Sequence, residues 1–319
     1  HAPRDHSREK EEKMIGWFSK NKKLLLRLFG TALAVALSVL LVEREGWSEI
    51  TSSLKQISLP VFALALLSLL ISRLFVILRW HVLLRSGGVV IPFSRTAQLT
   101  LTGLFASNYL PTTIGGDVVR LGGAMRLGYD RAVCLASIAA DRVIGMAGMF
   151  CAVPFGLIPA WSTLHAGTLQ LSAMPPLVAK ITDFIRRTLH SFSIWLKQPA
   201  ALISSLLYTW GNMVFIFASL YILIEGLGEH VSFSLVAGIW SLAYFVTLIP
   251  ISINGYGVQE LSLTFLFSHV AGLTPAISLT VAVLIRIVFL LASLPGAAFL
   301  PSVLSAMSDP NANSSKGSS

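Results

Sequence analysis

Long uninterrupted runs of apolar residues restrict what this sequence can fold into more than any other feature does. A helix that crosses a lipid bilayer needs about 20 mainly apolar residues. Backbone polar groups inside lipid have no water to bond, so such runs form helices. The sequence therefore predicts an all-α integral membrane protein, a polytopic helical bundle. The predicted spans are Leu24 to Val42, Leu59 to Leu78, Ala132 to Ile158, Ala201 to Leu223 and Ala276 to Leu300.

The charged residues support this prediction by their number and by their places. They make up only 12% of the 319 residues, against roughly 25% in a soluble domain. A net charge of +9 is also found in nucleic-acid-binding proteins, but here the basic residues collect at the ends of apolar runs, as cytoplasmic charges of membrane proteins do. We therefore expect no nucleic acid partner. The basic residues concerned are Lys20, Lys22, Lys23, Arg27, Arg79, Arg85, Arg95, Lys180, Arg186, Arg187 and Lys197.

The same charges predict the orientation of the chain. The lysines before Leu24 place the N-terminus in the cytoplasm, and the acidic loop from Glu43 to Ser58 lies outside. The stretch from Lys180 to Lys197 is basic again and spaces its apolar residues on one helical face. That pattern is typical of an amphipathic helix at the cytoplasmic membrane surface. We expect a multi-pass protein of the cytoplasmic (inner) membrane.

Composition divides the chain into three parts. Residues 1–13 mix basic and acidic side chains ahead of Met14, and we interpret them as a disordered leader or an added remnant. Residues 304–319 are small and polar, which is typical of a disordered tail. The membrane domain covers 14–303, with repeat-like halves at about 60–160 and 200–300 and the amphipathic helix at about 180–197.

Two similar interruptions break the apolar pattern. The first, in "NYLPTTIGGDVVR", follows a short apolar run from Ala97 to Leu110, and the second, in "LIPISINGYGVQE", follows one from Phe233 to Ile249. Each contains a proline and then glycines, which end a helix and permit unusual backbone angles. Each also precedes a long apolar helix that contains an arginine, Arg142 or Arg286.

The matched interruptions indicate a transport site. Short hydrophobic segments broken by proline and glycine, at corresponding places in two halves, are typical of transporter binding sites. The basic residues that follow the first interruption return it to the cytoplasmic side, whereas the second is entered from outside. We therefore expect two re-entrant broken-helix hairpins of opposite entry, arranged as an inverted repeat. Two ordinary helix–loop–helix turns at the surface are the alternative.

The two arginines inside apolar helices need an explanation, because a central arginine costs about 2.5 to 3.5 kcal/mol to insert. The guanidinium fork matches a lipid phosphate, so Arg142 and Arg286 are candidate headgroup ligands. Internal pairing is the alternative, with Arg142 bound to Asp117 and Arg286 bound to Glu260. The sequence leaves both roles open, because a paired arginine can also exchange partners during transport.

Five segments together resemble a known family. They extend from about Leu78 to Ile287 and read "LRWHVLL", "NYLPTTIGGDVVRLGGAMRLG", "ADRVIG", "PISINGYGVQE" and "AGLTPAISLTVAVLIRI". The sequence resembles the membrane domain of lysylphosphatidylglycerol synthases, which also occurs alone as a flippase-like family. The resemblance implies translocation of an aminoacylated phospholipid made by a soluble domain. About 20 residues follow the last apolar run here, so we expect transport and not synthesis.

The function we expect is movement of an anionic, aminoacylated or polyprenyl-phosphate-linked lipid across the membrane. The partners are then membrane lipids, whose phosphate-bearing headgroups would contact the arginines and the free amides at a helix start. A homo-oligomer and a partnership with a lipid-modifying transferase both stay open. The candidate substrate-binding residues are Asn108, Pro111, Gly115, Gly116, Asp117, Arg120, Arg142, Asn254, Gly255, Gly257, Glu260 and Arg286.

The sequence predicts no cofactor, no metal and no catalytic site. Its seven histidines are scattered and lack the HExxH pattern, and there is no phosphate loop or dinucleotide fingerprint. Transport would then be passive or coupled to an ion. The rival interpretation is an intramembrane enzyme, with Asp117 or Glu260 as its general base, or an accessory subunit of a separate transferase.

Overall fold

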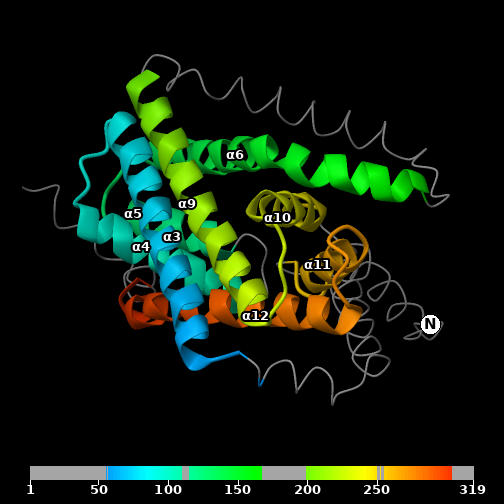
Figure 1. Ribbon diagram of the computed structural model, residues 1–319. Helices are drawn as coiled ribbons and strands as arrows, with labels where there is room; N and C mark the ends of the chain where they lie inside the picture. Colours follow the sequence, from blue (N-terminus) through cyan, green and yellow to red (C-terminus); the bar gives the residue numbers. More distant parts are fainter. Residues whose placement is uncertain are drawn as a thin grey trace, which may run out of the picture.

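Four long helices dominate the computed structural model, which describes residues 55, 57–109, 115–166, 199–249, 252 and 255–303. Each is long and apolar enough to cross a membrane. They are α3 (Leu59–Ser86), α6 (Arg131–Ala166), α9 (Pro199–Gly226) and α12 (Pro275–Ser293), the last continued by the 3-10 helix η1 (Leu294–Phe299) (Figure 1). All regular structure in the described residues is helical, which confirms the all-α membrane fold.

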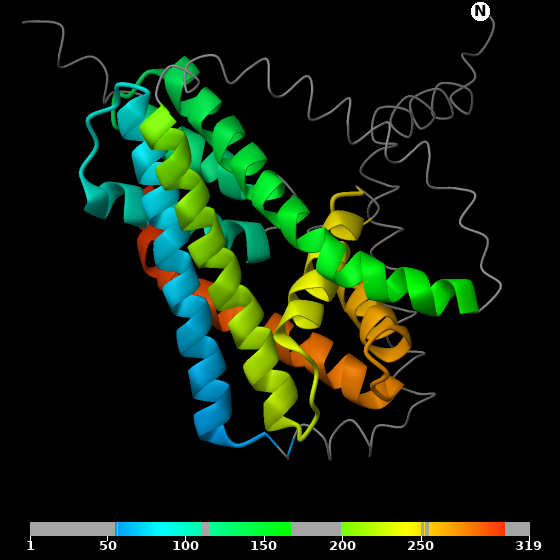
Figure 2. The same ribbon diagram turned by 45° about the horizontal axis from the view of Figure 1, so that its top comes forward.

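Several predicted segments lie outside the described residues. These are the first predicted span, Leu24 to Val42, the amphipathic helix at about 180–197, and both terminal segments. Helices α3 and α6 both extend beyond their predicted ends, α3 past Leu78 to Ser86 and α6 past Ile158 to Ala166. Helix α6 contains Pro154 and Pro159. Figure 2 shows α6 bent along its length, as expected where prolines remove helical hydrogen bonds.

Four shorter helices form two hairpins, one at each predicted interruption. The first hairpin consists of α4 (Phe93–Tyr109) and α5 (Gly115–Arg126), and the second of α10 (Phe233–Thr247) and α11 (Val258–His269). Each hairpin packs on itself and leads into a long helix, α6 after the first and α12 after the second. The proline of each interruption lies in a connection that is not described.

Helices α3 and α9 lie side by side and run in opposite directions in both views (Figures 1 and 2). Serine hydroxyls join their backbones: Ser68 donates to the Phe215 carbonyl and Ser219 to the Ala65 carbonyl, both at 2.9 Å. Close contact is also possible because Gly211 faces Phe75. This antiparallel pair is the centre of the main hydrophobic core, to which α10, α11 and α12 contribute.

The order of helices in 59–166 is repeated in 199–303. Helices α3 and α9 both have 28 residues, and α5 and α11 both have 12. Corresponding helices begin 140 residues apart, α3 and α9 at Leu59 and Pro199, and α4 and α10 at Phe93 and Phe233. The described chain therefore contains two units of similar layout.

The turns that close α3 and α9 repeat the same hydrogen bonds. Val89 donates its N–H to Leu84, and Glu229, at the equivalent place, donates to Ile224. Both turns use a glycine in the left-handed region, Gly88 at φ 91° and Gly228 at φ 80°, a conformation that costs glycine little. The two units thus share local turn chemistry as well as helix lengths.

Two contacts between α3 and α9 join equivalent residues of the two units. Ser72 donates a hydrogen bond of 2.9 Å to Asn212, 140 residues away. One turn further on, the Phe75 and Phe215 rings stack at 5.6 Å. In an antiparallel pair, a contact between equivalent positions lies where a two-fold axis relating the helices would pass. Residues 140 positions apart therefore meet at the centre of α3 and α9.

Gly156 and Gly238 allow α6 and α10 to touch through their backbones. A side chain added at either glycine would overlap the backbone of the other helix, so Gly238→Val should force the two helices apart. We expect this variant to lose about 1–3 kcal/mol of stability, seen as a lower melting temperature in detergent. Ser234→Val, at an exposed position of α10, is the control. Equal melting of the two variants would contradict this account of the crossing.

Candidate functional site

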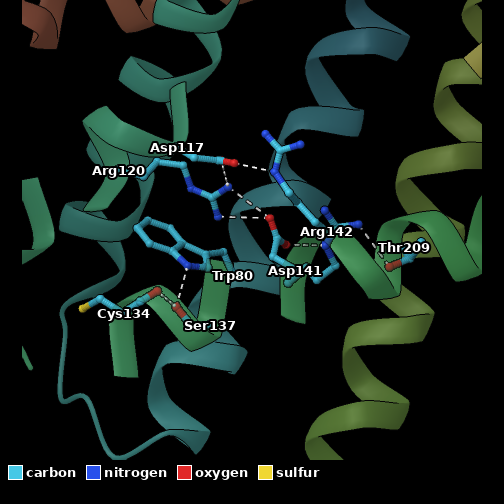
Figure 3. Close-up of polar contacts among 9 residues, drawn as sticks. Trp80, Asp117, Arg120, Cys134, Ser137, Asp141, Arg142 and Thr209 are labelled. Atoms are coloured by element: carbon cyan, nitrogen blue, oxygen red, sulfur yellow. Dashed lines mark hydrogen bonds and ion pairs between the residues drawn. The ribbon is translucent and has the colours of Figure 1, made fainter. Parts of the chain in front are cut away.

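A network of five charged side chains joins α3, α5 and α6. We call it the Asp141 cluster, and its members are Arg79, Asp117, Arg120, Asp141 and Arg142 (Figure 3). Asp117 is the third residue of α5 and pairs with Arg142, which lies on α6. The pairing that the sequence left open is therefore present.

Asp141 is the buried centre of this cluster, with only 3% of its surface exposed. Its Oδ1 accepts a hydrogen bond of 2.6 Å from Arg79, and its Oδ2 accepts two of 3.1 Å from Arg120. Arg79 also donates to the Thr209 hydroxyl on α9 at 3.2 Å. A buried carboxylate is tolerated only when it is paired and hydrogen-bonded in this way. Asp141, on α6, is thus joined through charge to α3 and α5.

Arg120 is held in place by an aromatic ring as well as by carboxylates. Its guanidinium carbon lies 4.0 Å from the centroid of the buried Trp80 ring, and the indole N–H of Trp80 donates to Ser137 at 3.1 Å. Such cation–π contacts strengthen in desolvated surroundings. Arg120 also lies 3.4 Å from Asp117. It therefore links the two aspartates of the cluster (Figure 3).

A smaller network on α11 and α12 resembles the Asp117–Arg142 part of the first. We call it the Glu260 cluster, and it contains Tyr256, Gln259, Glu260 and Arg286. Glu260 pairs with Arg286 through Oε1 and accepts the Gly257 N–H at 2.8 Å through Oε2. It therefore caps the start of α11 and neutralises Arg286 at once.

Arg286 makes two further contacts. It donates to the Gln259 side-chain oxygen at 2.8 Å, and its guanidinium carbon lies 4.7 Å from the centroid of the Tyr256 ring. Its side chain is 13% exposed, against 54% for Arg142. Arg286 is thus the more enclosed of the two paired arginines.

The two carboxylate–arginine pairs occupy equivalent places in the two units. Asp117 and Glu260 are the third residues of α5 and α11. Their partners Arg142 and Arg286 are the twelfth residues of α6 and α12. Each pair therefore ties the start of a hairpin's second helix to the long helix that follows it.

The two hairpins also touch each other. The Tyr256 hydroxyl at the start of α11 donates to the backbone carbonyl of Asn108 at the end of α4. Tyr109 donates to the Leu290 carbonyl on α12 at 3.5 Å. Asn108, a candidate from the sequence, thus lies beside the Glu260 cluster through its backbone. Tyr256 and Asn108 are 148 residues apart in the sequence, so the two interruptions are neighbours in space.

The remaining glycine candidates have structural explanations. Gly115 and Gly116 are buried at the start of α5, and a side chain on Gly116 would overlap Ser107 and Gly103 of α4. Gly255 and Gly257 adopt positive φ angles of 72° and 76°, which favour glycine. Two further candidates, Pro111 and Asn254, lie outside the described residues.

Three charged residues of the interior were not selected from the sequence as site residues. The prediction that Arg79 lies at a helix end is wrong: α3 continues to Ser86, and Arg79 is buried and bound to Asp141. Asp141 directly precedes Arg142 in the sequence and was not among the candidate residues. Arg73 lies inside the predicted span from Leu59 to Leu78 and is 6% exposed. The signal available for Arg73 was its place inside an apolar run.

Comparison with known families identifies the membrane part of the chain. A family model described as the lysylphosphatidylglycerol synthase TM region matches residues 27–296. The match includes both hairpins, the Asp141 cluster and the Glu260 cluster. No curated protein sequence matches the chain.

Proposed function

The chain belongs to the family of the lysylphosphatidylglycerol synthase transmembrane region, and on that premise we propose that it moves a lipid with an anionic headgroup across the membrane. The family supports a function related to membrane lipids. Candidate cargoes are anionic phospholipids, aminoacylated phospholipids and polyprenyl-phosphate-linked lipids, which all carry phosphate. We further propose that the protein lies in the cytoplasmic membrane with its N-terminus in the cytoplasm.

The observation that carries this proposal is the pair of equivalent carboxylate–arginine contacts, Asp117–Arg142 and Glu260–Arg286. A guanidinium fork binds phosphate oxygens in two parallel hydrogen bonds, as it binds a carboxylate. A carboxylate partner neutralises the arginine when no lipid is present, and it can be displaced by a phosphate. Each unit would thus offer one arginine to a passing headgroup.

The charge balance of the Asp141 cluster favours an anionic cargo. It contains three arginines and two aspartates, and so has one positive charge in excess. Asp141 is fully engaged by Arg79 and Arg120, while Arg142 is half-exposed and has Asp117 as its partner. Arg142 is therefore the member of this cluster best placed to accept a phosphate.

The two units suggest how a headgroup could be passed across. We propose that they form an inverted repeat, since α3 and α9 run antiparallel and equivalent residues meet at their centre. In transporters of this kind, re-entrant hairpins are entered from opposite faces and the two halves move against each other about a central site. Contacts with arginine side chains would replace the water around the headgroup, and the acyl tails would stay in lipid.

Reconstitution in liposomes tests this function. With no nucleotide present, wild type should make a labelled anionic or aminoacylated phospholipid accessible in the opposite leaflet faster than protein-free liposomes do. A headgroup crosses the hydrocarbon core slowly without help, for the same reason that a lone arginine does. Rates equal to those of protein-free liposomes for anionic, aminoacylated and polyprenyl-phosphate lipids would refute transport and favour the accessory-subunit alternative.

A further inference from the structure

Arg73 is a buried cation without a counter-charge. It lies halfway along α3 and is 6% exposed. Its Nε has no hydrogen-bond partner, and within the described residues its guanidinium forms no hydrogen bond or ion pair. An isolated buried charge is strongly unfavourable unless something pairs with it. The carboxylate of the Glu260 cluster is already bound to Arg286.

The position of Arg73 is as informative as its lack of a partner. It follows Ser72 and precedes Phe75, the two α3 residues that meet their equivalents on α9. Arg73 therefore lies at the level where equivalent residues of α3 and α9 meet. In transporters built from inverted repeats, substrates bind at this level, near the bilayer midplane and between the two units.

The ring that Arg73 contacts belongs to the other unit and leads to a second unpaired donor. The Arg73 guanidinium carbon lies 4.8 Å from the centroid of Phe289 on α12. Trp240 on α10 stacks on the same Phe289 ring at 5.4 Å. Trp240 is only 4% exposed, and its indole N–H also lacks a hydrogen-bond partner in the described residues. Two buried donors with no acceptor thus flank one aromatic ring.

We propose that Arg73 and Trp240 form a binding site for the oxyanion of a phosphodiester headgroup at the centre of the membrane. The guanidinium binds the phosphate oxygens, and the indole N–H donates to a second acceptor of the same headgroup, such as an ester carbonyl or hydroxyl. Neither donor has an internal acceptor, so the ligand completes both. This site would bind the headgroup of the lipid whose transport we propose above, and its assignment rests on that proposed function.

The site also connects with the Glu260 cluster. Phe289 lies one helical turn beyond Arg286 on α12. Because Arg73 contacts Phe289, it lies near the segment of α12 that carries Arg286. A phosphate that displaced Glu260 from Arg286 would have Arg73 as the next cation near the centre. Unlike Arg286, Arg73 holds no carboxylate that must first be displaced. Arg73 is therefore suited to bind the headgroup while Arg142 and Arg286 are still paired with Asp117 and Glu260.

Thermal unfolding in detergent, with short-chain lipids as probes, tests the site without measuring transport. The probes are dihexanoyl-phosphatidylglycerol, dihexanoylglycerol, which lacks the phosphate, and inorganic phosphate. We expect phosphatidylglycerol to raise the melting temperature of wild type in a concentration-dependent way, and dihexanoylglycerol to have no such effect. Stabilisation by inorganic phosphate equal to that by phosphatidylglycerol would overturn the assignment to a lipid headgroup.

Arg73→Met removes the cation and keeps an apolar side chain. Because it removes an unpaired charge, the lipid-free variant should melt no lower than wild type, yet bind phosphatidylglycerol about tenfold more weakly or worse. Trp240→Phe keeps a ring against Phe289, removes only the N–H, and should weaken binding about threefold or more. Arg95→Met, at an exposed arginine on α4, is the matched control and should bind as wild type does.

Three results would overturn the proposal. They are unchanged phosphatidylglycerol binding in Arg73→Met, an equal loss of binding in Arg95→Met, and a lipid-free Arg73→Met protein that melts far below wild type while Trp240→Phe binds normally. The last result would assign Arg73 a structural role. Because binding is measured in detergent, a site that binds as expected in a protein without transport activity would refute the transport proposal alone.

Discussion

Replacing Asp141 by asparagine is expected to lower the folded yield of the protein more than any other single change at the two clusters. Asp141 is the shared counter-charge of Arg79 and Arg120, and it is almost completely buried. Asparagine keeps the size of the side chain but leaves two buried guanidinium groups without a full negative charge. Removing one partner of a buried pair costs about 3–5 kcal/mol, and here two arginines lose theirs.

The measurement is the monodisperse fraction after extraction, together with the melting temperature of what remains. Asp130→Asn is the matched control, because Asp130 is exposed at the start of α6 and its side chain accepts the Val133 N–H, which asparagine can also do. Adding Arg120→Met to Asp141→Asn should recover part of the yield, since one unpaired cation is removed. If Asp141→Asn and Asp130→Asn gave equal yields, the central place of Asp141 would be wrong.

Much of the fold follows from the sequence because membrane helices are specified locally. An apolar run long enough to cross a bilayer must be helical whatever surrounds it, and the spans at Leu59, Ala132, Ala201 and Ala276 are indeed helices. The pairing of Arg286 with Glu260 was also predictable, as the alternative to binding a lipid headgroup. An arginine in an otherwise uncharged helix needs a partner, and few carboxylates are available.

The Asp141 cluster was harder to predict because it depends on how distant helices pack. Arg79 lies near the end of its apolar run, where a cytoplasmic position and a buried one look the same in sequence. Only the approach of α3 to α5 and α6 makes Arg79 and Arg120 share Asp141. Gly116 was likewise a candidate substrate-binding residue, whereas the contact of α5 with α4 explains why a glycine is needed there.

The second large effect concerns lipid movement and the two paired arginines. Arg286→Lys should keep the protein folded, because a lysine can still neutralise Glu260, but it replaces a two-pronged fork with a point charge. We expect transport of an anionic phospholipid to fall about tenfold or more, in line with the loss of a charge-assisted hydrogen bond. Arg142→Lys should have a smaller effect, because Arg142 is more exposed than Arg286.

Arg95→Lys is the matched control for both substitutions. Arg95 is exposed and donates to Gln98 on its own helix, so the exchange should leave both folding and transport unchanged. A structural role for Arg286 predicts a different pattern, in which the lysine variant loses folded yield and the surviving protein transports at the wild-type rate.

The central claim is that the Asp117–Arg142 and Glu260–Arg286 pairs carry an anionic headgroup across the membrane without nucleotide. The most direct measurement is the initial rate at which a labelled phosphatidylglycerol becomes accessible in the opposite leaflet of liposomes. It should be made for wild type, Arg142→Lys/Arg286→Lys, Arg95→Lys and protein-free liposomes, at equal protein content. We predict wild-type and Arg95→Lys rates well above the protein-free rate, with the double variant close to it. A double variant as fast as wild type would contradict the claim.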